Sequence, residues 1–83
     1  GARIGMVHDA GARTGRLARV RALFKDADAV VFGHSHLPLL ERGDDGFQIF
    51  NPGSPTERRG APEHTMGIAT VDRGAVHFEL ISL

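Results

Sequence analysis

The sequence contains no cysteine, tryptophan or tyrosine, and only five phenylalanines. Without cysteine, no disulfide can stabilise the fold. The lack of cysteine fits a reducing compartment such as the cytoplasm. The few aromatic rings leave little of the stacking surface on which single-stranded nucleic acids bind. Ten basic residues balance ten acidic ones, and a net charge of zero argues against a general binder of polyanions. Nucleic acid is therefore expected only in the form of nucleotide-type substrates.

Long hydrophobic runs are also absent. The longest apolar segments span only a few residues, far fewer than the roughly 20 that a membrane-spanning helix needs. The sequence does not open with the charged and then apolar pattern of a secretory signal. A chain of 83 residues forms at most one domain, and at this size it buries only about 60–65% of its unfolded surface. We expect a soluble, cytoplasmic domain over residues 1–83 with no membrane partner.

The pattern of apolar residues predicts an α/β chain, with one βαβ unit followed by an antiparallel β-meander. The unit has strands over 4–7 and 29–32. Between them a helix is expected from Thr14 or Gly15 to Lys25, with the Thr14 hydroxyl as its N-cap. The meander consists of strands over 37–41, 47–50, 66–71 and 75–80, with tight turns at 44–46 and 72–74.

The predicted helix carries arginines on several faces outside its apolar stripe. We expect them to form a solvated surface, because long charged side chains usually point into water. A phosphate-facing role for Arg13 or Arg16 is the alternative, since both lie near the loop that follows the first strand. The arginines are Arg13, Arg16, Arg19 and Arg21.

Three histidines follow the two strands of the βαβ unit. His8 ends the first strand, and His34 and His36 come after the second. In extended backbone, residues two apart point to the same side, so His34 and His36 are expected to face one cavity with Ser35 turned away. The strands of a parallel crossover end at one edge of the sheet, where open α/β sheets bind ligands. Because imidazole is the commonest metal ligand, we predict a metal site; the alternative is that the histidines are merely solvated or hydrogen-bonded.

Three further residues are candidates for shaping this site. Gly33 allows a tight exit from the second strand or a close approach of the backbone to a bound group. Asp9 could orient a ligating imidazole from behind, or could simply be solvated. Asn51 opens the turn sequence Asn-Pro-Gly-Ser at 51–54. Its side chain is expected either to satisfy the backbone of that turn or to shape the mouth of a substrate site.

The order of these motifs resembles the C-terminal half of small calcineurin-like metallophosphoesterases. The motifs are His8, the sequence VVFGHSH at 30–36 and the sequence NPGS at 51–54. The resemblance covers nearly the whole chain and is closest to the bacterial and archaeal phosphodiesterase branch. It implies part of a four-layer αββα sandwich and a centre of two divalent metal ions, Mn, Ni, Fe or Zn. Since Gly1 leads directly into a strand, we expect the chain to be the C-terminal portion of a longer domain.

By position, the resemblance implies that His8 and His34 ligate one metal and His36 the other. The implied activity is hydrolysis of phosphodiester or phosphomonoester bonds by a metal-activated hydroxide, with a small phosphoester as substrate. The family motifs D-x-H, G-D-x-x-D and G-N-H are missing from these 83 residues. No catalytic proton donor or bridging carboxylate is therefore expected in this chain, which alone should be inactive. A missing N-terminal segment or another chain is expected to complete the site.

Two other functions stay open from the sequence. Relatives with this fold serve as scaffold subunits, as in the retromer coat, so a non-catalytic interaction module is the main alternative. The presence of all three histidines favours the enzyme. A single-metal binder that uses His8, His34 and His36 without catalysis is the third candidate, and a homo-oligomer is left open.

Overall fold

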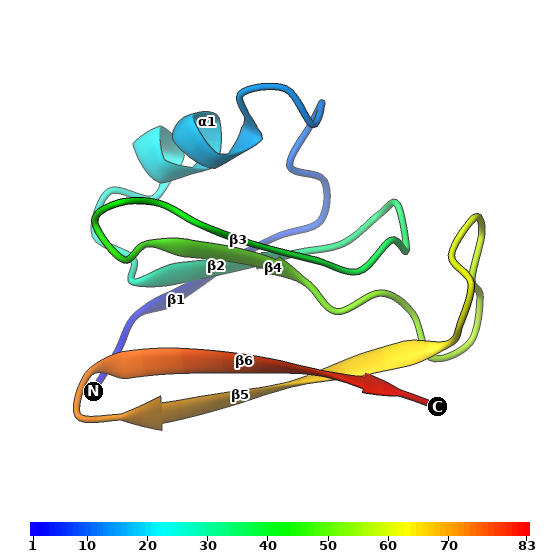
Figure 1. Cartoon of the computed structure of the whole chain (residues 1–83). Coiled ribbons are helices and arrows are strands. Elements are labelled where there is room, and N and C mark those ends of the chain that lie inside the picture. The colour runs from blue at the N-terminus through cyan, green and yellow to red at the C-terminus, as the bar shows by residue number, and fades with distance from the viewer.

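The computed structural model describes residues 1–83 as one helix and six strands in three layers (Figure 1). Helix α1 covers one face of a four-stranded sheet, and a two-stranded sheet lies against the other face. No helix in the structure is long and apolar enough to cross a membrane. The elements are β1 (Ile4–Val7), α1 (Arg16–Leu23), β2 (Ala29–Phe32), β3 (Leu39–Arg42), β4 (Gln48–Asn51), β5 (Thr65–Asp72) and β6 (Ala75–Ser82).

The four-stranded sheet has the order β1-β2-β4-β3. β1 pairs with β2 in parallel, so the predicted βαβ unit is confirmed, as is the α/β class. β3 and β4 form the predicted antiparallel hairpin, but β4 also pairs in parallel with β2. The second hairpin, β5-β6, makes a sheet of its own. The two hairpins are therefore divided between two layers, because the turn and loop after β4 carry the chain from one layer to the other.

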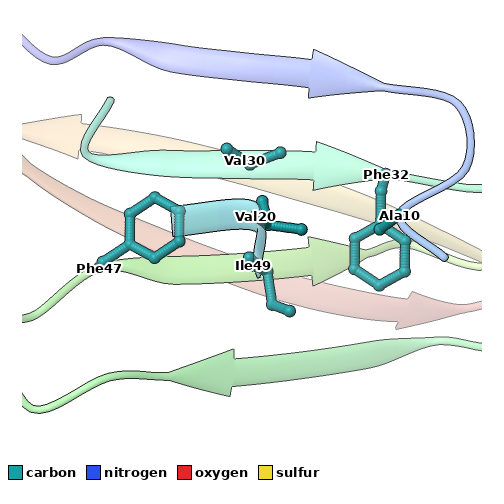
Figure 2. Close-up of a cluster of buried hydrophobic side chains, with 6 residues drawn as sticks. All are labelled: Ala10, Val20, Val30, Phe32, Phe47 and Ile49. Atoms are coloured by element: carbon teal, nitrogen blue, oxygen red, sulfur yellow. The ribbon is translucent and has the colours of Figure 1, made fainter. Parts of the chain in front are cut away.

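Side chains from α1 and from the four-stranded sheet build the core (Figure 2). Val20 of α1, Val30 of β2 and Ile49 of β4 are each at most 1% exposed. Burial of such side chains is the main force that holds α1 on the sheet. The loop after β1 is anchored in the same cluster through Ala10, two residues beyond His8. The cluster consists of Ala10, Val20, Val30, Phe32, Phe47 and Ile49.

The helix starts later and ends earlier than the sequence predicts. Its N-cap is Gly15, in a left-handed conformation with φ 71°, and no side chain caps the helix. The prediction of Thr14 as N-cap is therefore wrong, because the chain enters the helix through a turn that only glycine adopts without strain. At the other end, Phe24 leaves the helix and packs across Gly5, where an added Cβ would lie 2.6 Å from the ring.

The prediction of a solvated arginine surface is wrong for Arg16, whose side chain is only 11% exposed, while Arg19 and Arg21 keep exposed surface but also make specific contacts. Arg19 donates hydrogen bonds to the carbonyl oxygens of Ala10 and Ala12 over 2.8 and 2.6 Å. The guanidinium groups of Arg16 and Arg21 lie 4.8 and 4.7 Å from the ring centres of Phe32 and Phe47. Cation–π contacts of this kind stabilise by about 0.5–2 kcal/mol. These arginines fasten α1 to the sheet and to the loop that carries His8.

The two sheets are joined by a few specific contacts. Phe78 of β6 stacks on Phe50 of β4 with ring centres 4.5 Å apart. Gly67 of β5 leaves room for that stack, because a Cβ there would lie 2.5 Å from the Phe50 ring. The Gln48 amide donates to the carbonyl oxygen of Val76 over 2.7 Å. The β5-β6 hairpin is thereby fixed beneath β4, the strand that ends at the candidate site.

Candidate metal centre

The carboxyl ends of the three parallel strands β1, β2 and β4 meet at one edge of the sheet. In Figure 1 the loops that follow these strands gather on one side of the molecule. His8 directly follows β1, the two other histidines follow β2, and Asn51 is the last residue of β4. The Gly33 N–H donates to the His8 carbonyl oxygen over 2.9 Å, which ties the first two loops together. The sheet topology thus places every predicted site residue at one edge.

His8 and His34 are in direct contact there. The Nε2 atom of His8 and the Nδ1 atom of His34 form a hydrogen bond of 3.2 Å, with the rings nearly perpendicular at 78°, so one of the two nitrogens carries a proton when no metal is bound. Two nitrogens on one ion at metal–nitrogen distances of about 2.05 Å and a tetrahedral angle would be about 3.3 Å apart. The observed separation therefore suits two ligands of a single metal ion. Both side chains are exposed, so an ion could reach them from solvent.

His36 lies apart from this contact. Its Nδ1 atom is hydrogen-bonded to the main-chain carbonyl oxygen of Glu57. A carbonyl can only accept, so Nδ1 carries the proton and Nε2 keeps a free lone pair. Residues 1–83 contain no group of three or more histidine, aspartate or glutamate side chains placed to hold one ion. The structure therefore does not support a single-ion site built from His8, His34 and His36, and their assignment to two metals stays a prediction.

The backbone of the histidine turn differs from the expected extended form. His34 and His36 both have positive φ, 75° and 61°. The prediction that alternate residues of an extended segment point to one side is therefore wrong here. Histidine enters the left-handed region more readily than most residues, yet each such residue still costs about 1–3 kcal/mol. The conformation persists because polar contacts from other loops hold it.

Asn51 provides the first of these contacts and is fully buried. Its Nδ2 atom donates to the Gly33 carbonyl oxygen over 3.5 Å and to Ser35 Oγ over 3.2 Å. Its Oδ1 atom accepts from the Gly53 N–H over 2.9 Å. Asn51 therefore satisfies the backbone of its own turn and also holds the histidine turn. Gly33 takes part through its carbonyl oxygen as well as through its N–H.

Asp9 organises the loop after β1. One carboxylate oxygen accepts from the Gly11 N–H over 2.9 Å, and the other lies 4.0 Å from His34 Nε2. The second distance is too long for a direct hydrogen bond. Asp9 thus stands beside the His34 ring while it shapes its own loop.

Two residues that the sequence did not single out contact the histidine turn, Glu57 through its carbonyl oxygen and Arg59 through its guanidinium group, and Ser54 in turn contacts Glu57. Ser54 Oγ accepts from the N–H groups of Thr56 and Glu57, and Arg59 donates to the His34 carbonyl oxygen over 2.8 Å. Ser54 to Glu57 match the S-x-x-E capping pattern, in which a hydroxyl accepts from the N–H three residues on. That pattern could have indicated Ser54, whereas nothing local to Arg59 indicates its contact.

The class of protein follows from comparison with known families and structures. The chain belongs to the calcineurin-like phosphoesterase superfamily, whose domain profile matches residues 1–74. No curated protein matches the chain.

Several solved structures share the fold. A Thermotoga maritima protein is 32% identical, with a TM-score of 0.60, over 96% of this chain and 47% of its own length. A predicted phosphoesterase of Streptococcus pneumoniae is 20% identical, with a TM-score of 0.65, over 84% and 40%. Vps29 of Entamoeba histolytica complexed with zinc is 21% identical, with a TM-score of 0.60, over 93% and 52%. The chain spans about half the length of the solved structures that it matches.

Proposed function

We propose that this chain supplies the histidine side of a metal-dependent phosphoesterase centre that hydrolyses phosphodiester or phosphomonoester bonds. The observation that carries the proposal is the 3.2 Å separation of His8 Nε2 and His34 Nδ1. The pair lies at the carboxyl edge of a parallel sheet, where α/β folds bind their ligands. Membership of the calcineurin-like phosphoesterase superfamily supports divalent metals and phosphoesters as its ligands.

Each histidine has its own task in this proposal. His8 and His34 would hold one ion, and His36 would offer Nε2 to a second. Neutral imidazole suits Mn, Fe, Ni or Zn. When bound, two divalent ions supply polarisation of the phosphoryl oxygens and a lowered pKa for bound water. Deprotonated nitrogens are required, because a metal ion and a proton compete for the same lone pair.

The remaining ligands would come from outside these residues. A catalytic metal keeps about three protein ligands, and only His8 and His34 are paired here. Edge strand β1 is a suitable place for a further segment or a second chain to join, because Met6 there is 78% exposed. We therefore propose that these 83 residues alone do not turn over substrate. A cytoplasmic location and a small phosphoester as the natural substrate are parts of the same proposal.

A non-catalytic interaction module is the second candidate. Several large apolar side chains are exposed on the strands, and exposed apolar surface is the observation that favours it. They include Ile4 and Met6 on β1 and Ile68, Val71 and Leu80 on the β5-β6 hairpin. A scaffold, however, has no need for two imidazoles in contact at an exposed edge. The histidine pair thus favours the enzyme.

The test is hydrolysis of bis(p-nitrophenyl) phosphate and p-nitrophenyl phosphate by the natural full-length protein with Mn or Ni. We expect His34→Ala to lower kcat/KM by more than about 100-fold, beyond the 10–100-fold typical of losing a group behind a ligand. The matched control is His77→Ala, which removes an exposed imidazole from β6 and should leave turnover unchanged. Turnover that resists chelation, or survives the double change of His34 and His36 to Ala, would contradict the proposal. A scaffold would show neither turnover nor tight two-site Mn binding by calorimetry.

A further inference from the structure

The turn after β4 is connected to His36 through a short series of hydrogen bonds. Ser54 is only 8% exposed, and its Oγ atom accepts from the Thr56 N–H over 3.3 Å and from the Glu57 N–H over 3.1 Å. Pro55 has no N–H to offer. The two N–H groups that follow the proline therefore both converge on one hydroxyl, and this fixes the direction of the peptide at Glu57.

Glu57 is thereby held at both of its main-chain polar groups. Its N–H is bonded to Ser54 Oγ, and its carbonyl oxygen accepts from His36 Nδ1. The tautomer of a histidine is set by the hydrogen bond that one of its nitrogens makes. With Nδ1 committed as a donor, only Nε2 of His36 is free to bind a cation.

We propose that Ser54 is a positioning residue that fixes the Nδ1–H tautomer of His36, acting through the main-chain carbonyl of Glu57. The consequence is that Nε2 is presented to a divalent cation before the cation arrives. This consequence rests on the proposed function, whereas the tautomer itself is a property of the metal-free protein. Groups that hydrogen-bond to a metal-ligating histidine typically account for 10–100-fold in metal affinity.

A second contact from the same loop supports this role. Arg59 donates to the His34 carbonyl oxygen over 2.8 Å. The segment from Ser54 to Arg59 therefore touches both residues of the turn that have positive φ. Asn51, the last residue of β4, holds the same turn at Ser35. The histidine turn is therefore held both by the end of β4 and by the loop that follows it.

The first test is nitrogen NMR of the histidine rings in the natural full-length protein, free of metal and in alkaline buffer. His36 should show a protonated Nδ1. In Ser54→Ala the His36 signals should move toward the mixture of tautomers seen in water, and Ser54→Thr should restore them. Glu57→Ala should change nothing, because the main-chain carbonyl remains. Ser82→Ala, which removes an exposed hydroxyl from β6, is the matched control.

The second test is calorimetric titration of the same variants with Mn or Zn. Ser54→Ala should weaken binding of one of two ions by about 10-fold, while Glu57→Ala and Ser82→Ala should bind as the parent protein does. A protonated Nε2 in metal-free His36 would overturn the inference even if Ser54→Ala fails to fold. So would an unchanged tautomer in Ser54→Ala, or a lost one in Glu57→Ala. The expected tautomers without any ion binding would instead support the Ser54–His36 connection and refute the proposed function.

Discussion

Where α1 packs on the sheet, the side chains of Val20, Val30 and Ile49 are buried. At the edge of the same sheet, by contrast, His8 and His34 are exposed and lie on loops. The first region is stabilised by apolar burial, which is insensitive to direction. The second contains two residues with positive φ and is held by directed hydrogen bonds from other loops. Substitutions in the apolar core and substitutions in the histidine site should therefore affect different properties, the first mainly stability and the second mainly metal binding.

The largest expected effect is on the core. Ile49→Ala should lower the free energy of unfolding by about 2–5 kcal/mol, because Ile49 is fully buried and the change leaves a cavity. Thermal or urea unfolding of the full-length protein measures this loss. Ile68→Ala, at an exposed position on β5, is the matched control and should cost far less. Equal losses at the two positions would break the distinction between core and surface.

Asn51→Ala should produce the next largest loss of stability, and it should also affect the histidine site. It removes the donor to Ser35 and the acceptor for Gly53 in a buried place. Unsatisfied buried groups cost about 1–3 kcal/mol. Unlike Ile49→Ala, this variant should also weaken Mn binding when measured below its unfolding temperature. If Mn affinity stays at the parent level, Asn51 serves only its own turn.

In the histidine turn, unlike in the core, the smaller replacement side chain should give the more stable variant. At the left-handed position 34, glycine carries no steric penalty, whereas a side chain costs about 1–2 kcal/mol. His34→Gly should therefore be more stable than His34→Ala by about 1 kcal/mol, and both variants lack the imidazole of the proposed metal site. Comparison of their unfolding midpoints checks this difference. Greater stability of the alanine variant would show that residue 34 does not hold a positive φ.

The smallest effect concerns pH and lies far from the site. The Phe47 N–H, followed by the charge of Arg21, holds the pKa of the Asp45 carboxyl below its usual value. A group with a lowered folded pKa stabilises the protein above its unfolded pKa, and this contribution fades as the pH falls through the folded value. Asp45→Asn should thus flatten the acid side of the stability curve slightly. The control is Asp44→Asn, one residue away in the same exposed turn. In urea unfolding at a series of acid pH values, its free energy of unfolding should fall more steeply, as the pH is lowered, than that of Asp45→Asn.

Much of the scaffold follows from local sequence patterns. The apolar runs at 4–7 and 29–32 predicted the two parallel strands, and Arg73-Gly74 lies in the tight turn expected there, with φ 53° and 81°. The parallel pairing of β4 with β2 was not foreseen, since it depends on where the hairpin docks. The arginine contacts were missed because each depends on a partner, such as Phe32, on another element.

The sequence predicted that the residues of the candidate site lie at one edge of the sheet, but it did not predict the backbone conformation of the histidine turn. His8 and His34 were expected to meet because parallel strands share an edge, and they do. The left-handed turn was missed because its supports lie far along the chain, 16 residues away at Asn51 and 25 at Arg59. No window around residues 33–36 contains that information. Long-range polar contacts, unlike apolar periodicity, leave no regular signal in the sequence.

The most direct test of the histidine pair is anomalous diffraction at the manganese edge from crystals of the natural full-length protein grown with Mn. The account predicts one peak within coordinating distance of both His8 Nε2 and His34, and a second at His36 Nε2. No peak at His8 and His34, or manganese bound only elsewhere in the protein, would contradict it.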